Sequence, residues 1–189
     1  MVKILARGAL LSIILLITAL SATALGSDYV SNFKRIPTIH NQPPQVAVWK
    51  GTPTVVVCDS APINEKQAKK AVKFWEDLGY NFFSTQYRYD PLEKCRSTSP
   101  VGYIVVQLIT QDIRIDEDSL AQTHFFVDND HNEVSWAIIY LKSNVRDTVL
   151  EHELGHALGF LHFNKINHIM NSKWTQGGWD TTGLRKVRR

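Results

Sequence analysis

The stretch from His152 to His162 constrains this chain more than any other, because it reads H-E-L-G-H-A-L-G-F-L-H. His152 and His156 are four residues apart, so both imidazoles lie on one face of an α-helix, one turn from each other. Gly159 can adopt the positive φ that ends a helix sharply, and the reversal would return His162 toward the helix. Imidazoles that converge in this way can bind one metal ion. The stretch therefore predicts a helix and a turn built around a metal.

The number and type of ligands indicate which metal and which kind of site to expect. Three protein ligands leave one coordination position open, which is the pattern of a catalytic zinc site rather than a structural one. Zinc lowers the pKa of a bound water from about 16 to about 7. We therefore expect His152, His156 and His162 to hold Zn²⁺, with Glu153 leaning over the same ion as the catalytic general base. The competing interpretation, an amphipathic helix with packed or solvated histidines, gives no reason for these side chains to share one face.

The complete pattern is similar to the signature of the metzincins, a family of zinc metalloproteases. Downstream, H-I-M-N at residues 168–171 resembles the metzincin Met-turn, in which Met170 would lie beneath the zinc. The separation of His162 from Met170 is similar to that in the matrixins, the branch that contains the matrix metalloproteases. The resemblance is specific from about residue 147 to residue 174.

Some residues differ from the patterns of the individual metzincin branches. Phe163 follows the third histidine, where matrixins usually carry an acidic or small polar residue. Ser172 stands where astacins and serralysins place a tyrosine ligand, and no cysteine switch of the Pro-Arg-Cys-Gly type lies upstream. His168, close to the Met-turn, is either a further hydrogen-bond donor at the site or a structural histidine.

The resemblance implies an α+β fold of the zincin type. Such a domain has a twisted mixed β-sheet with two main helices, an active-site helix that carries the histidines, and a short C-terminal subdomain with the Met-turn. It also implies a zinc-dependent endopeptidase that hydrolyses peptide bonds through a zinc-activated water, with Glu153 as the general base. A protein or peptide substrate would bind in an extended conformation along the edge strand. The alternative is a catalytically inactive, zinc-containing module that binds peptides.

Residues 1–26 have the composition of a secretory signal peptide. A basic region that contains Lys3 and Arg7 precedes an apolar run at residues 9–20, and A-T-A at residues 22–24 resembles a cleavage site. We therefore expect a secreted protein, extracellular or periplasmic, with no stable membrane association after cleavage. The alternative is an uncleaved N-terminal membrane anchor, because the apolar run at its longest reaches about the length of a minimal span.

The remaining chain, roughly 165 residues, is long enough for one compact domain. Residues 27–50 are polar and contain several prolines, so we expect an extended leader or a short propeptide there, followed by the catalytic domain at residues 51–189. The formal net charge is +3, and much of it lies in residues 185–189. A basic end without interleaved aromatic residues is typical of a solvated terminus. We therefore expect no nucleic-acid partner, and a monomer.

Cys58 and Cys95 are the two cysteines of the chain. In a secreted protein an even number of cysteines indicates a disulfide, which here would join an early strand to a later loop. Such a bond would contribute about 3–4 kcal/mol to stability. The alternative is a pair of reduced, buried thiols. Neither cysteine has a C-x-x-C neighbour, so we expect no cysteine-based zinc site.

Local patterns also predict the elements that precede the metal helix. Residues 54–58 are apolar and mostly β-branched, as in a buried strand. Asn64 and Gln67 have the spacing of a capping box for a helix that ends near Leu78, before Gly79. Further strands are expected at residues 80–89, 103–109, 123–127 and 134–141.

The polar loop at residues 128–133 permits two interpretations. Asp128, Asp130 and Asn132 alternate in a way that can direct oxygen atoms toward a Ca²⁺ ion. The same residue types favour an ordinary hairpin turn, because Asn and Asp tolerate turn geometry.

Overall fold

A computed structural model describes residues 41–89, 95, 101–111, 113–115, 118–128, 130–143 and 145–186. The predicted signal peptide and residues 27–40 of the predicted leader lie outside the described residues. The strands are β1 (Val48–Trp49), β2 (Thr54–Cys58), β3 (Ser84–Tyr89), β4 (Tyr103–Leu108), β5 (Ala121–Asp128) and β6 (Glu133–Leu141). The helices are α1 (Glu65–Asp77), α2 (Val149–Ala157) and the 3-10 helix η1 (Trp174–Gln176). The fold is α+β, as the sequence predicts.

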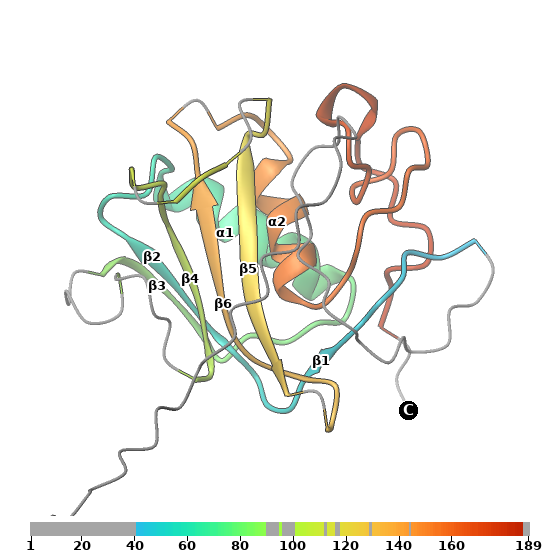
Figure 1. Cartoon of the computed structure of the whole chain (residues 1–189), viewed down its shortest axis with the longest axis horizontal. Helices are drawn as coiled ribbons and strands as arrows, with labels where there is room; N and C mark the ends of the chain where they lie inside the picture. Colours follow the sequence, from blue (N-terminus) through green and yellow to red (C-terminus); the bar gives the residue numbers. More distant parts are fainter. Residues whose placement is uncertain are drawn as a thin grey trace, which may run out of the picture.

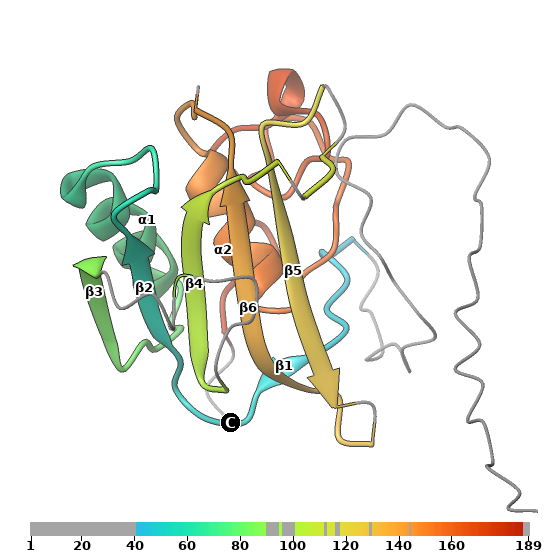
Figure 2. The same ribbon diagram turned by 60° about the vertical axis from the view of Figure 1, so that its left-hand side comes forward.

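The strands form one mixed sheet in which β5 is the antiparallel edge strand. The order is β1-β6-β4-β2-β3. The sixth strand, β5, lies outside this order and pairs with β6. Figure 2 shows β3, β2, β4, β6 and β5 side by side in this order. The pairs of β2 with β3, β2 with β4, and β4 with β6 are parallel, whereas β5 runs antiparallel to β6 along its whole length. The outer side of β5 is therefore a free sheet edge within the described part of the chain.

The continuous apolar run at residues 54–58 forms a strand that is buried on both faces. Successive side chains of a strand point to opposite faces. Val55 and Val57 accordingly lie in the core between the sheet and the helices, while Val56 and Cys58 lie in a second core on the opposite face. This arrangement confirms the prediction of a buried strand.

Both helices pack on the same face of the sheet (Figure 1). α1 begins at the predicted capping box, in which the Asn64 side chain accepts from the Gln67 amide and the Gln67 side chain accepts from the Asn64 amide. Trp75 on α1 is fully buried, and its Nε1 donates to the carbonyl of Glu151 on α2 at 2.7 Å. This bond ties the two helices together. Neither helix has the length and apolar character needed to cross a bilayer, as far as the described residues extend.

The chain just before residue 50 is part of the domain core. Val46 and Ala47 are buried, and β1 pairs with the start of β6. The Val46 amide donates to the carbonyl of Gly159 at 2.9 Å, next to the end of α2. The prediction of a leader that precedes the domain therefore stays a prediction for the residues before Asn41.

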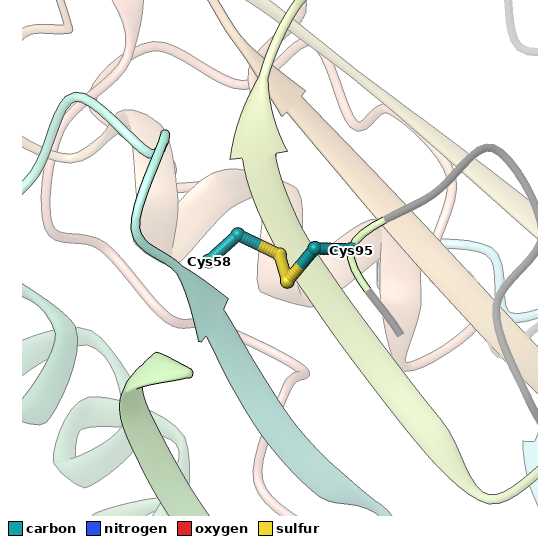
Figure 3. The surroundings of a disulfide bond; sticks show 2 residues. All are labelled: Cys58 and Cys95. Atoms are coloured by element: carbon teal, nitrogen blue, oxygen red, sulfur yellow. A yellow bond between two sulfur atoms is a disulfide. The ribbon is translucent and has the colours of Figure 1, made fainter. Parts of the chain in front are cut away.

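Cys58 and Cys95 form a disulfide, which confirms that prediction. Figure 3 shows the bond reaching from the end of β2 to Cys95. Cys95 packs against the second core, on the face of the sheet that is opposite to the helices. The bond therefore lies on the other side of the sheet from α2 and its histidines.

Residues 160–186 follow α2 as an irregular segment whose ordered turns include η1. Ile169, Met170 and Leu184 anchor this segment in the main core. Tyr80 donates its hydroxyl to the carbonyl of Leu184 at 3.0 Å, so the end of the described chain is fastened to the region after α1. Figure 1 shows this segment, in orange and red, beside α2.

Candidate metal centre and its cleft

His152, His156 and His162 come together at one point in space. The distances between their Nε2 atoms are 3.0 Å for His152 and His156, 3.1 Å for His156 and His162, and 3.3 Å for His152 and His162. The helix supplies the first two side chains from adjacent turns, and the reversal after α2 supplies the third. The three predicted ligands thus form a group that could hold a metal ion.

Backbone carbonyls orient the two helical imidazoles. Nδ1 of His152 donates to the carbonyl of Ile169 at 2.7 Å, and Nδ1 of His156 donates to the carbonyl of Phe160 at 2.8 Å. Because a carbonyl can only accept, both Nδ1 atoms must carry the proton, and in a neutral ring the Nε2 atom is then a bare acceptor. In metal sites, carbonyls that accept from the second ring nitrogen of a histidine ligand fix its tautomer and its orientation, and these two carbonyls do the same here.

Burial keeps these imidazoles neutral. Burial, followed by the neighbouring His162, lowers the pKa of His152 from its usual value to about 4. Burial and the two neighbouring histidines hold the pKa of His156 well below its usual value. Only the neutral imidazole can bind a metal, so the centre is ready to do so near neutral pH.

The geometry fits a tetrahedral metal site. In neutral His152 and His156 the two Nε2 lone pairs face each other at 3.0 Å. Neither atom carries a hydrogen, so no hydrogen bond can form between them, whereas a cation placed between them would remove the repulsion of the lone pairs. Zn–N bonds of about 2.0–2.1 Å in tetrahedral geometry place nitrogen ligands about 3.3–3.4 Å apart. The observed separations of 3.0–3.3 Å are close to this value. The donor set, three imidazoles, suits zinc.

Gly159 makes the reversal that carries His162. Its φ is +90°, and a Cβ at this position would overlap the carbonyl of Ala47. Glycine is required here both for its conformation and for the close approach of the neighbouring segment. The Leu161 amide then donates to the carbonyl of Pro44 at 2.8 Å, which fixes the path of the chain toward His162.

Glu153 lies in the same cleft as the histidines. This cleft, called the histidine cleft below, is bounded by the start of β5, by α2 and by residues 169–177. The Glu153 side chain is buried, and its Oε2 accepts a hydrogen bond of 2.5 Å from the hydroxyl of Thr123 on β5. A carboxylate beside a metal-binding group, in a cleft next to a free strand edge, can accept a proton from a reacting molecule.

Met170 is fully buried under α2. A Cβ on Gly155 would overlap the Met170 sulfur, which shows that this side chain lies directly against the helix beside His156. The turn that carries Met170 is closed by the Asn171 amide, which donates to the carbonyl of His168 at 3.1 Å.

Comparisons with known proteins find similarity among solved structures. The sequence matches no protein-family model and no curated protein. Among solved structures, the chain is similar to the crystal structure of metalloproteinase-II from Bacteroides fragilis, with 15% identity and a TM-score of 0.45. The similar region covers 74% of this chain and 53% of that chain, so this chain spans about half the length of the solved protein.

His168 has a structural position. It is fully buried, its Nδ1 accepts from the Met170 amide at 3.0 Å, and its Nε2 donates to the carbonyl of Thr182 at 3.1 Å. Both ring nitrogens are therefore used inside the turn. This geometry favours the structural interpretation over that of a donor in the cleft.

The loop at residues 128–133 has the contacts of a turn. Asp128 accepts from the Asp130 amide at 3.0 Å and pairs with Nδ1 of His131 at 2.8 Å. Asn132 adopts a positive φ of 54°, as turn residues of this type do. The oxygens of Asp128 are used by its own loop, which favours the turn over the calcium interpretation.

Sequence reasoning missed two contributions to the site. Thr123 was expected only as part of a strand, although its contact with Glu153 makes it a member of the cleft. A polar side chain between Ala121 and Phe125, on the inward face of the strand, is the signal that could have singled it out. Trp49, assigned to the leader, donates its Nε1 to the carbonyl of Ala157 at 2.8 Å and so supports the end of α2.

Proposed function

We propose that this protein is a secreted zinc metalloendopeptidase of the metzincin type, with the matrixins as the branch that it most resembles. The observation that carries the proposal is the convergence of three Nε2 atoms within 3.3 Å of one another in the same cleft as the buried carboxylate of Glu153. A metal that activates water, together with an adjacent base, is one of the arrangements that can hydrolyse an unactivated amide.

His152, His156 and His162 would hold Zn²⁺ and leave a coordination position open toward the cleft. When bound, zinc supplies a Lewis acid and lowers the pKa of water. Glu153 takes a proton at its carboxylate as water adds to the peptide carbonyl, and then passes that proton to the leaving amine. Burial of the Glu153 side chain limits exchange of this proton with solvent.

The substrate in this proposal is a protein or peptide in an extended conformation. The free edge of β5 borders the histidine cleft, and residues 119–123 contribute to the lining of that cleft. An extended peptide can add to such an edge through main-chain hydrogen bonds. The N-terminal composition supports secretion, with cleavage after residue 24 or nearby.

The test compares Glu153→Gln with wild type on unfolded casein, with zinc content measured for both. The variant keeps the shape of the side chain but cannot accept the proton, so we expect turnover to fall by about 10²–10⁴-fold with zinc retained. Glu151→Gln is the matched control. Glu151 is also a buried carboxylate on α2, but it pairs with Lys70 at 3.7 Å and lines a different depression of the surface.

Each outcome has a distinct meaning. Equal turnover in Glu153→Gln and wild type would refute the role of Glu153. A zinc-loaded wild type that cleaves no peptide would favour the alternative, an inactive module that binds peptides. A secreted chain without zinc after mild purification would count against the metal site itself.

A further inference from the structure

The carboxylate of Glu153 is held by a residue from a different element. Thr123 lies on β5, thirty residues earlier in the chain, and its Oγ1 donates to Oε2 of Glu153 at 2.5 Å. The same hydroxyl lies 3.2 Å from the main-chain carbonyl oxygen of Glu153. Hydrogen bonds that involve a charged group are short and about twice as strong as neutral ones. The contact is therefore strong enough to restrict where the carboxylate points.

The strand explains why this hydroxyl faces α2. Ala121 and Phe125, the alternate neighbours of Thr123, both pack on the core between the sheet and the helices. Thr123 therefore shares the inward face of β5, and its side chain points away from the next residues, Gln122 and His124. A hydroxyl on this otherwise apolar face has a specific partner rather than solvent.

We infer that Thr123 is a positioning residue for Glu153, an inference that rests on the proposed function. It acts through Glu153 and also joins the base to the strand along which a substrate would lie. β-Branched residues have restricted χ1 rotation, so Thr123 holds its hydroxyl in place with little freedom. The strand that binds the peptide thus also sets the position of the group that takes the proton.

The experiment measures kcat and KM on fluorescein-labelled unfolded casein for wild type, Thr123→Val and Thr123→Ser. The valine variant keeps the branched shape and removes the hydroxyl, so we expect kcat to fall by about 10- to 100-fold with KM within about twofold. The serine variant restores the hydroxyl and should recover most of the kcat. Thr85→Val, on β3 at the far edge of the same sheet, is the matched control and should match wild type.

A second background tests whether Thr123 acts through Glu153. In a Glu153→Gln chain, adding Thr123→Val should change the residual turnover by less than about twofold, because the group that Thr123 positions is already lost. Thr123→Ala replaces the valine variant if thermal unfolding shows that the latter does not fold.

The outcomes separate this inference from the proposed function. Wild-type kcat in Thr123→Val, equal losses in the valine and serine variants, or additive losses in the Glu153→Gln background would each overturn the positioning role while leaving the peptidase proposal intact. A wild-type chain that binds zinc but cleaves no casein would overturn both.

Discussion

The sheet and the segment that follows α2 are stabilised by different kinds of interaction. In the sheet, the strands pair along regular ladders and their side chains fill a core on each face. Residues 160–186 have no strand, and their turns combine backbone hydrogen bonds with hydrogen bonds from side chains to the backbone. The His168 side chain forms hydrogen bonds with the Met170 amide and the Thr182 carbonyl. The side-chain amide of Asn171 donates through Nδ2 to the carbonyl of Lys165 at 2.8 Å.

The histidine centre lies on the boundary between these two regions. His152 and His156 belong to a regular helix, which determines their spacing by itself. His162 belongs to the irregular segment, where its position depends on Gly159 and on neighbouring loops. A substitution that disturbs the irregular segment should therefore displace His162 and weaken metal binding. A substitution that disturbs the sheet should mainly lower the stability of the whole domain.

The largest effect is expected where the two regions meet, at Gly159. In Gly159→Ala the positive φ costs about 1–2 kcal/mol, and overlap of the new Cβ with the Ala47 carbonyl costs about 1–3 kcal/mol more. We expect a loss of about 2–5 kcal/mol in the free energy of unfolding, together with loss of bound zinc, because His162 moves. Chemical denaturation and elemental analysis of zinc measure the two effects.

Gly102→Ala is the control for this prediction. Gly102 has a similar φ of +86°, but a Cβ there meets nothing within 4 Å. The free energy of unfolding of Gly102→Ala should therefore fall only by the conformational cost of the positive φ, about 1–2 kcal/mol. The variant should keep its zinc. Equal losses in the two variants would show that the close approach to Ala47 is unimportant.

Removal of the disulfide tests the sheet side of the comparison. The bond closes a loop with a sequence separation of 37 residues, for which chain entropy predicts a contribution of about 3–4 kcal/mol. Because the bond lies on the face opposite to the helices, the double variant Cys58→Ala, Cys95→Ala should lose this stability and still bind zinc. A variant that loses zinc while folded would contradict the separation of the two regions.

The smallest effect is expected at Asp180, in the irregular segment. Hydrogen bonds from Lys165 and Thr182 hold the pKa of its carboxyl well below the usual range. Since the folded pKa is the lower one, the stabilisation is present above about pH 4 and is lost as the pH falls below that value. Asp180→Asn should therefore be less stable than wild type at neutral pH by less than about 1 kcal/mol, and the difference should shrink in acid.

Asp77→Asn gives the matching measurement in the regular region. Asp77 pairs with Lys73 at 2.8 Å on the exposed face of α1, so its loss should cost no more than about 0.5 kcal/mol. Thermal unfolding of both variants between pH 3 and pH 7 compares them. A difference between Asp180→Asn and wild type that grows toward acid would contradict the assigned direction of the pKa.

Local sequence patterns were sufficient to predict the structure where the deciding interaction joins residues that are close in the chain. The capping box of Asn64 and Gln67 spans three residues, and His152 and His156 are brought together by one helical turn. The strand at residues 54–58 followed from an unbroken apolar run. The disulfide pairing followed because the chain has two cysteines in all. In each case the number of competing arrangements is small.

The tertiary structure alone decided which distant residues complete the site. Any of several polar side chains could have reached Glu153, and Thr123 does so because β5 is the antiparallel edge strand with this face turned to α2. Residues 44–49, which the sequence predicts to be part of a polar, proline-containing leader, belong to the domain because they pack beside Gly159 and pair with β6. The physical reason is that strand order and loop packing depend on the summed burial of the whole chain. No local pattern within a few residues contains that sum.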